Sequence, residues 1–248
     1  MSAADDLLQK IAHRPWELPK EPWLYYQEWN HALFLHWKVA YEELRKLVPQ
    51  ELTIDTIDGA CWVSLVAFTM EKVRSRGIPS ISMLSNFHEV NIRTYVIRDD
   101  KPGVYFLNIE SEKYLSTVIS KFVSKLPYEK ARIKRYSRKN GQEYFSTNRN
   151  KGRALDTSFK PGKELSKKTD IEHSLTERYC LYFDHNDKIY WYDIHHEPWS
   201  LHNVEMIYLK TDYEFGNLSL DRKPNLIHYS PGVKVLAWQR SAIMSQFA

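Results

Sequence analysis

The sequence predicts a mainly β fold of the α+β type: one domain built on an antiparallel sheet, with about two short helices. Three observations lead to this prediction. Aromatic residues make up 14% of the 248 residues, and aromatic side chains favour strands. Stretches of alternating apolar and polar residues recur along the chain, separated by short turn sequences. Few stretches show helical spacing. Many sequential hairpins then favour a sheet that is curled or closed, which protects its edges.

Residues 1–22 are polar and contain three prolines, which predicts a short N-terminal arm. We expect residues 23–248 to form a single domain, because all-β domains often reach about 200–250 residues. Residues 23–29 predict its first strand.

The segment 39–49 spaces its apolar residues like a helix and closes at Pro49, which predicts a short helix. Residues 52–70 indicate two strands joined at Asp58-Gly59, because Asp-Gly is a hairpin turn signal. Residues 85–111 predict a second hairpin that turns at 99–103.

Residues 111–125 form the strongest helix candidate, with Ser111 as its N-cap and Pro127 beyond its end. Its apolar stripe consists of Tyr114, Leu115, Val118, Ile119 and Phe122.

The remaining sequence returns to strands. Residues 131–138 and 142–149 predict a hairpin around Asn140-Gly141, a strong turn signal. Residues 178–196 predict another hairpin with alternating aromatics, and 204–210 and 232–240 predict two further strands.

Charge is unevenly distributed along the chain. The net charge is +4, but residues 125–168 hold 14 Lys/Arg and 4 Asp/Glu, which gives +10 there and −6 elsewhere. A basic segment can bind nucleic acid, but it is more often a solvated hairpin face. The sequence has no recognition-helix pattern, zinc-finger spacing or RNA-binding sheet motif, so nucleic acid is not the expected partner.

No run of apolar residues approaches the roughly 20 needed to span a membrane, and the N-terminus lacks the pattern of a signal peptide. The two cysteines, Cys61 and Cys180, are too few for a disulfide framework and lie in apolar runs. We therefore expect buried thiols in a cytoplasmic protein without a membrane partner.

The sequence also lacks several cofactor and catalytic motifs. It contains no glycine-rich nucleotide-binding motif and no Gly-x-Ser-x-Gly elbow, so no cofactor is expected. His195-His196-Glu197 lacks the His-Glu-x-x-His spacing of zinc sites. We interpret these residues as a strand end and turn with a packed Trp199, and expect no metal.

Residues 87–96, FHEVNIRTYV, raise the main functional question. Glu89, Asn91 and Arg93 alternate with an apolar row, so they share one face of the predicted strand. That polar row either faces water, as is usual in an antiparallel sheet, or faces the interior of a barrel that holds a ligand. The residues alone favour water, because charged side chains are rarely buried.

A resemblance changes this balance. Several stretches, in this order and spacing, resemble the uncharacterised bacterial YqjF-like family of the acetoacetate decarboxylase-like superfamily, from about residue 16 to about residue 235. They are YYQEWNHALFLHWKV, GACWVSLVAFTM, FHEVNIRTYV, PGVYFLNIES, KLPYEKA, LTERYCLYF and HHEPWSLHNVE.

The resemblance implies a cone-shaped, largely antiparallel β-barrel with a central cavity. In the related decarboxylases an aromatic-x-Glu stretch places its Glu in that cavity, and Phe87-His88-Glu89 is similar. Glu89 is then expected inside, and Asn91 and Arg93 follow by alternation.

The decarboxylase mechanism is not expected to carry over. Those enzymes have a Pro-Lys-Lys segment, whose first Lys forms a Schiff base and whose second lowers the pKa of the first. Here the matching stretch is Pro127-Tyr128-Glu129-Lys130, so Tyr128 stands in place of the reactive amine. Lys130 is nearby, but a one-residue shift along a strand turns a side chain to the other face, so Lys130 is not expected to act as the reactive amine.

The leading hypothesis is therefore a small oxo- or hydroxy-acid bound in the cavity, with Glu89 as acid or base. Asn91, Arg93, Tyr128 and Arg178 would bind this substrate, and Arg178 would also be the charge partner of Glu89. Whether the protein is an enzyme is left open, as is homo-oligomerisation. The alternative hypothesis is a non-catalytic ligand-binding or interaction module that uses the basic face 125–168.

Overall fold

The computed structural model describes residues 2–80, 86–112, 126–139 and 141–242. Within these residues the helices are α1 (Ala3–Gln9), α2 (Tyr41–Arg45) and α5 (Asp170–Thr176). The strands are β1 (Tyr25–Val39), β2 (Thr53–Ile54), β3 (Cys61–Ser75), β4 (Phe87–Arg98), β5 (Lys101–Ser111), β6 (Tyr128–Lys130), β7 (Arg132–Arg138), β8 (Gly141–Asn148), β9 (Arg153–Glu164), β10 (Cys180–His185), β11 (Lys188–His196), β12 (His202–Asp212), β13 (Glu214–Phe215), β14 (Leu218–Ser219), β15 (Leu226–Ala237) and β16 (Ser241–Ala242). The protein is mainly β, as the sequence predicts.

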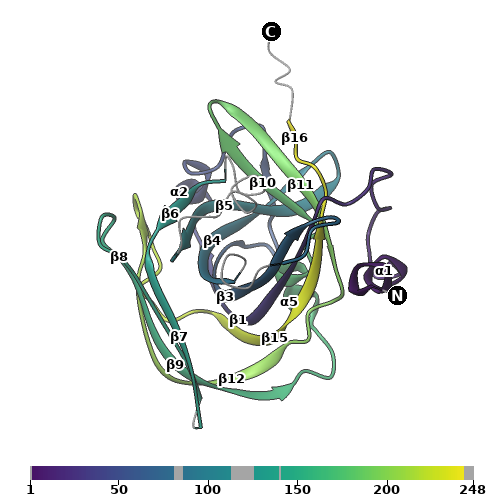
Figure 1. Ribbon diagram of the computed structural model, residues 1–248. Helices are drawn as coiled ribbons and strands as arrows, with labels where there is room; N and C mark the ends of the chain where they lie inside the picture. The colour runs from purple at the N-terminus through teal and green to yellow at the C-terminus, as the bar shows by residue number, and fades with distance from the viewer. Residues whose placement is uncertain (1, 81–85, 113–125, 140, 243–248) are drawn as a thin grey trace.

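One large sheet closes on itself. Strands β11, β10, β5, β4, β3, β1 and β15 pair in that order. Strand β11 also pairs with β15, which closes the ring, and Ile194 lies opposite Ala237 there. Figure 1 shows this ring of strands around the centre of the molecule. Most of its pairings are antiparallel, but β10 runs parallel to β5. The ring therefore departs from a purely antiparallel sheet at this point.

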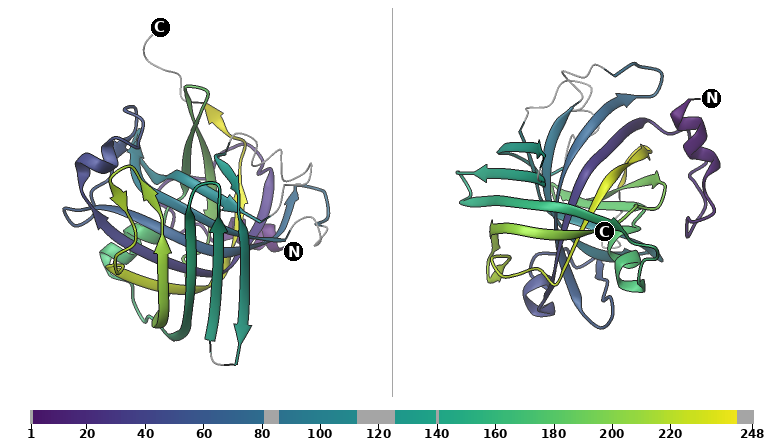
Figure 2. Two further views of the ribbon diagram at one scale, coloured as in Figure 1. Left: turned by 90° about the vertical axis from the view of Figure 1, so that its left-hand side faces the viewer. Right: turned by 90° about the horizontal axis from the view of Figure 1, so that it is seen from below.

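The same sheet continues past β15 into β12, β9, β8 and β7, which we call the outer layer. Figure 1 shows these strands beside the ring, and Figure 2 shows that they extend beyond it at one end. Buried residues of the outer layer, such as Tyr144, Leu155 and Phe159, belong to the same apolar cluster as Val90 and Ile92 of β4. The outer layer thus helps to bury the outward face of the ring.

The opposite face of the ring strands carries a second apolar cluster. It contains Phe87 and Tyr95 of β4, whereas Val90 and Ile92 belong to the cluster on the other face. This division follows the alternation of side chains along a strand. Because both clusters are well packed, β4 is buried on both faces through most of its length.

Two of the three helices in the described residues begin with capping boxes. Ser2 and Asp5 exchange hydrogen bonds at the start of α1, and Thr169 and Glu172 do so at the start of α5. Neither helix was predicted from the sequence, although the capping-box spacing is present there. Helix α1 lies within the expected arm 1–22 and packs through Leu7 against a cluster on β1 and β15.

The expected helix 39–49 is confirmed in shorter form as α2, whereas the candidate at 111–125 lies almost entirely outside the described residues.

The hairpins were predicted with mixed success. Those at 85–111 and 178–196 are confirmed as β4–β5 and β10–β11. The hairpin expected within 52–70 is wrong in its pairing. A turn does form at Asp58-Gly59, with one isolated bridge across it, but β2 pairs with β4 and not with β3. Strand β9 was not predicted.

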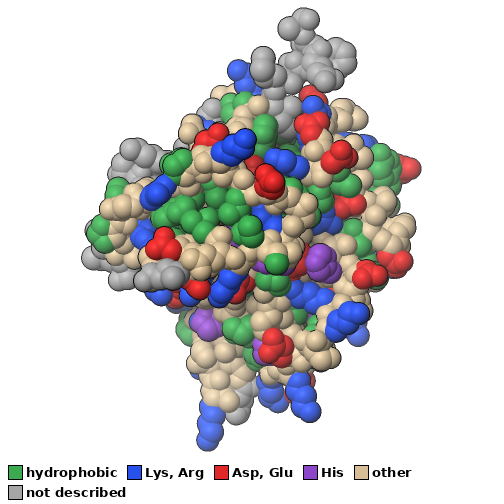
Figure 3. Space-filling view, turned by 90° about the vertical axis from the view of Figure 1, so that its right-hand side faces the viewer, with side chains coloured by type: hydrophobic (Ala, Val, Ile, Leu, Met, Phe, Trp, Pro, Cys, Tyr) green, Lys and Arg blue, Asp and Glu red, His purple; other side chains and the backbone are tan. Residues whose placement is uncertain are grey.

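The basic segment 125–168 supplies β6 to β9. In Figure 3, Lys and Arg side chains gather at the lower end of the molecule, which is the end of the β7–β8 hairpin in Figure 2. No helix within the described residues is long and apolar enough to cross a membrane. The division into an arm and one domain stays a prediction.

The parallel contact between β5 and β10 yields a test of the ring. A Cβ at Gly103 would come within 2.5 Å of the Cys180 carbonyl oxygen and 2.7 Å of the Tyr182 ring. We expect Gly103→Ala to lower the free energy of unfolding by about 2 kcal/mol, because a packed backbone cannot yield to an added methyl group. Urea denaturation measures this loss.

Gly162→Ala is the matched control, because its Cβ would lie 3.1 Å from the nearest atom, the Asn203 carbonyl oxygen. This milder contact should lower the free energy of unfolding clearly less than Gly103→Ala does. Equal stabilities of the two variants would show that the close approach of β5 and β10 does not constrain the fold.

Candidate functional site

A small pocket lies within the ring. Its volume is about 30 Å³, which is room for about two water molecules. The described residues that line it are mostly apolar: Trp29, Val66, Phe68, Met70, Glu89, Asn91, Arg93, Phe106, Ile109, Leu126, Tyr128, Leu181 and Trp199. The polar row of β4 therefore reaches this pocket, and the water-facing alternative is wrong.

Glu89 is the buried acid of the pocket, with 3% of its surface exposed. Its Oε1 accepts a hydrogen bond of 3.0 Å from Asn91 Nδ2, two residues along the same face of β4. Its Oε2 accepts a hydrogen bond of 2.6 Å from the Tyr128 hydroxyl. Each carboxyl oxygen thus has one donor.

The environment of Glu89 brings its pKa close to neutrality. Burial raises the pKa from 4.5 to about 7, because the charged form loses its hydration. Hydrogen bonds from Tyr128 and Asn91 and the charge of Arg93 act in the opposite direction but do not outweigh burial. A carboxyl group of this kind can take up and release a proton near pH 7.

Arg93 is the buried cation of the pocket, with 6% of its surface exposed. Burial lowers the pKa of its guanidinium, and interaction with Tyr95 raises it in part. The guanidinium lies 5.7 Å from the centroid of the Phe34 ring. The pairing of β4 with β5 shifts register between Ile92 and Arg93, so a bulge occurs at the residue that carries this charge.

Tyr128 reaches the pocket from β6, which pairs in parallel with β5 and places Tyr128 opposite Ile109. Burial and the nearby Glu89 carboxylate raise the pKa of its hydroxyl well above the ordinary value, so the hydroxyl stays a donor. Glu129 pairs instead with Arg153 at 3.0 Å. Lys130 is exposed and lines a separate surface depression with Arg132.

Arg178 has a different partner from the one expected. Its Nη1 lies 2.7 Å from Asp55 Oδ2, and its guanidinium lies 5.2 Å from the centroid of the Tyr95 ring. It is not among the described residues that line the pocket. The expected ion pair with Glu89 is therefore replaced by one with Asp55, because Arg178 follows α5 and its Nε donates a hydrogen bond to the Ser174 carbonyl oxygen of that helix.

Two tryptophans of the pocket wall were not predicted as site residues. Trp29 comes from β1, and Trp199 follows β11. Their rings stack at 6.2 Å between centroids. Both lie in stretches that carry the family resemblance, which is the signal that could have identified them. Trp199 is packed, as expected, but it packs against the pocket.

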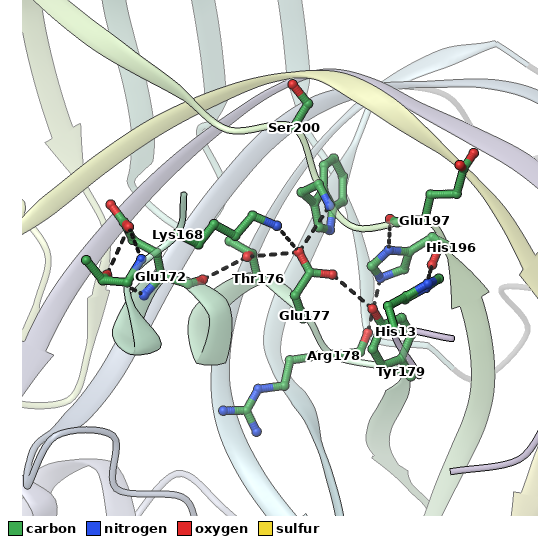
Figure 4. Close-up of polar contacts among 12 residues, drawn as sticks. His13, Lys168, Glu172, Thr176, Glu177, Arg178, Tyr179, His196, Glu197 and Ser200 are labelled. Atoms are coloured by element: carbon green, nitrogen blue, oxygen red, sulfur yellow. Dashed lines mark hydrogen bonds and ion pairs between the residues drawn. The ribbon is translucent and has the colours of Figure 1, made fainter. Parts of the chain in front are cut away.

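A buried carboxylate fixes the backbone at Trp199. Glu177 Oε1 accepts a hydrogen bond of 3.0 Å from the Trp199 backbone N–H, and Oε2 accepts one of 3.0 Å from the Tyr179 hydroxyl. Lys168 forms an ion pair with the same carboxylate. Figure 4 shows Glu177 between Lys168 on one side and Tyr179 on the other. Burial raises the pKa of Glu177, but the nearby His196 and Lys168 and these hydrogen bonds leave it lowered overall.

The two adjacent histidines make contacts with the backbone. His195 Nε2 lies 3.0 Å from the Leu7 carbonyl oxygen, and His196 Nδ1 lies 2.7 Å from the Glu197 carbonyl oxygen. Neither is among the described residues that line the pocket. The described part of the chain contains no cluster of three or more His, Cys, Asp or Glu side chains suited to a metal ion.

Solved structures with the same arrangement define the fold class. An acetoacetate decarboxylase from Legionella pneumophila aligns with a TM-score of 0.61 at 10% identity, over 100% of this chain and 98% of that chain. Another acetoacetate decarboxylase aligns with a TM-score of 0.60 at 13% identity, over 98% and 99%. The enduracididine biosynthesis enzyme MppR, complexed with pyruvate, aligns with a TM-score of 0.59 at 9% identity, over 92% and 93%. This protein therefore has the acetoacetate decarboxylase-like fold.

Sequence similarity defines the family within that class. Residues 26–234 match the DUF2071 family of uncharacterised conserved proteins, and the chain belongs to that family. The uncharacterised protein YqjF of Bacillus subtilis (strain 168) is 34% identical over 238 residues, which cover 94% of this chain and 98% of YqjF. The resemblance drawn from the sequence is confirmed.

The Glu177 contacts yield a stability prediction. We expect Glu177→Gln to lower the free energy of unfolding by about 2 kcal/mol, because the Lys168 ammonium loses its partner in a mostly buried place. Glu205→Gln is the control, since the Lys160–Glu205 pair is exposed and should contribute less than about 1 kcal/mol. Urea denaturation of both variants decides the point, and equal losses would contradict the buried role of Glu177.

The pKa of Glu89 yields a pH prediction. A carboxyl whose pKa is raised from 4.5 to about 7 on folding contributes stability below pH 4.5 that is lost as the pH rises through 7. The wild-type protein should therefore lose about 2–3 kcal/mol from this group between about pH 5 and pH 8.

Glu89→Gln removes the titration, so the stability difference between Glu89→Gln and wild type should shift by that amount in favour of the variant as the pH rises. Denaturation curves at several pH values measure the difference, with Glu205→Gln as a surface control. Parallel curves for Glu89→Gln and wild type would mean that Glu89 titrates normally.

Proposed function

We propose that the ring of strands forms a β-barrel and that this protein binds a small oxo- or hydroxy-acid in its cavity. Binding does not involve a Schiff base. The observation that carries the proposal is the juxtaposition of Glu89, held by Tyr128 and Asn91, with the buried Arg93 in an otherwise apolar pocket. A buried cation of this kind is costly without an anionic partner. A guanidinium can bind a carboxylate through two parallel hydrogen bonds, so Arg93 is the proposed anchor.

The other polar groups of the pocket complete the proposed site. Asn91 and Tyr128 hydrogen-bond the ligand, and Glu89 serves as acid or base, because its pKa of about 7 allows both forms near neutral pH. Arg178, which was first assigned to substrate binding, is proposed instead to stabilise the pocket wall through its ion pair with Asp55. The complex of MppR with pyruvate supports an oxo-acid as the class of ligand to test first.

The size of the pocket limits the ligand. With room for about two water molecules, the pocket accepts a three-carbon acid only after a lining side chain moves. Met70 is the most flexible of the apolar lining side chains, because its thioether chain has three rotatable bonds. We therefore propose a ligand of about three carbons.

The absence of a Schiff base rests on the residues that reach the pocket. The sequence resemblance matches Tyr128 with the reactive lysine, and a phenol cannot form an imine. Among the described lining residues there is no lysine. Lys130 is exposed, away from Glu89.

An interaction module on the basic face is the second candidate. Tyr136 and Phe145 of the outer layer are 42% and 36% exposed, beside the exposed Lys134. Exposed aromatics among basic side chains are typical of contact surfaces. This candidate predicts that ligand capture depends on Lys134 and not on Arg93.

Calorimetric titration with pyruvate separates the two candidates. We expect Arg93→Met to weaken pyruvate binding at least about tenfold, because the carboxylate loses a charged pair of hydrogen bonds. Lys134→Glu, on the outer layer, should leave the affinity unchanged. The opposite pattern would favour the interaction module.

Borohydride reduction in the presence of pyruvate checks the mechanism separately. We expect no covalent addition to the protein, measured by mass spectrometry. An added pyruvate-derived mass on any lysine would contradict the proposal.

A further inference from the structure

Three polar atoms in residues of the pocket wall lack partners. Among the described residues, no hydrogen-bond partner reaches Asn91 Oδ1, Arg93 Nε or Trp29 Nε1, and all three atoms are buried. All three residues line the same pocket. Buried polar atoms are nearly always paired, and leaving one unpaired is costly. Three in one pocket wall indicate that the pocket holds a group that supplies their partners.

The chemistry of each atom defines the partner that it needs. Arg93 Nε and Trp29 Nε1 carry hydrogens and require acceptors, which a carboxylate provides. Asn91 Oδ1 is an acceptor and requires a donor. The orientation of this amide follows from its neighbour, because Asn91 Nδ2 donates to Glu89 Oε1 and leaves the oxygen as the unmatched atom.

We infer that the ligand is a small 2-hydroxy acid in preference to a 2-oxo acid. Its carboxylate accepts from Arg93 and Trp29, and its hydroxyl donates to Asn91 Oδ1. This inference rests on the proposed function and names its ligand class. A 2-oxo acid carries acceptors only, so it would leave Asn91 Oδ1 unmatched or place a second oxygen against it.

Two other sources of a donor are less suited to the pocket. The ammonium group of a 2-amino acid has three N–H donors and needs several acceptors, but both Glu89 oxygens already accept hydrogen bonds. Water molecules alone would fit the space of about 30 Å³, but they would not neutralise the buried Arg93. A hydroxyl beside a carboxylate supplies the one donor and the anionic acceptors together.

Calorimetric titration with four three-carbon acids tests the inference. Lactate, pyruvate, alanine and propionate share a skeleton and differ in the group beside the carboxylate. We expect lactate, tested as separate enantiomers, to bind about tenfold more tightly than pyruvate, the effect of about one hydrogen bond. Propionate should bind no better than pyruvate, since it offers no donor.

Asn91→Leu assigns the preference to the amide. This variant should bind lactate and pyruvate with equal affinity, because the acceptor is gone. Loss of the hydrogen bond from Asn91 to Glu89 acts on both ligands alike, so it does not change their ratio. The preference of the wild-type protein is already a test, so the inference can be refuted even where Asn91→Leu does not fold. Glu205→Gln, on the exposed surface, should keep the wild-type ratio.

The outcomes separate this inference from the proposed function. Failure of all four acids to bind overturns both. Binding of pyruvate as tightly as lactate, lost in Arg93→Met, overturns the hydroxy-acid inference and leaves acid binding intact. Tightest binding of alanine shows that an ammonium is the donor and also overturns the inference. An unchanged preference for lactate in folded Asn91→Leu overturns the role of Asn91.

Discussion

Burial of β4 on both of its faces is the constraint on which the rest of the site depends. Val90 and Ile92 pack toward the outer layer, while Glu89 and Asn91 face the pocket. An ordinary antiparallel sheet leaves one face to water, and a carboxylate there keeps its usual pKa. Here the pairing of β11 with β15 closes the ring and the outer layer covers the other face, so Glu89 loses its hydration. The raised pKa of Glu89 and the buried, unpartnered Nε of Arg93 both follow from that closure.

The departure from the decarboxylase pattern gains a physical meaning from the structure. The sequence resemblance matches Tyr128 with the reactive lysine of the decarboxylases, and the Tyr128 hydroxyl donates a hydrogen bond to Glu89. Its neighbour Glu129 lies on the other side of β6 and pairs with Arg153 of the outer layer. This protein shares the fold of the decarboxylases. In the function proposed above, a hydrogen-bond donor stands where those enzymes carry a nucleophile, and the proposed chemistry is acid binding with proton exchange in place of imine formation.

Parts of the fold and site could be predicted because their signals are local. The β4–β5 and β10–β11 hairpins follow from turn residues beside alternating strands, and α2 follows from helical spacing before Pro49. Helices α1 and α5 carry capping boxes that could have been noticed. The pairing of β2 with β4, the parallel contact of β5 with β10 and the partner of Arg178 could not be predicted. Each joins segments far apart in the chain, and no local pattern specifies which distant strand or side chain will be adjacent.

The sequence by itself determined that Glu89, Asn91 and Arg93 share one face of a strand, because side chains alternate with a period of two residues. It also determined that no lysine stands at position 128. The family resemblance led us to expect this face inside, but only the tertiary structure decided it, since alternation does not say which face a second layer will cover. The tertiary structure likewise brought Tyr128, Trp29 and Trp199 to the same pocket from three other segments. The physical reason is burial: the ionisation of Glu89 and the partners that its neighbours lack depend on what surrounds the strand, and the strand's own residues do not encode that.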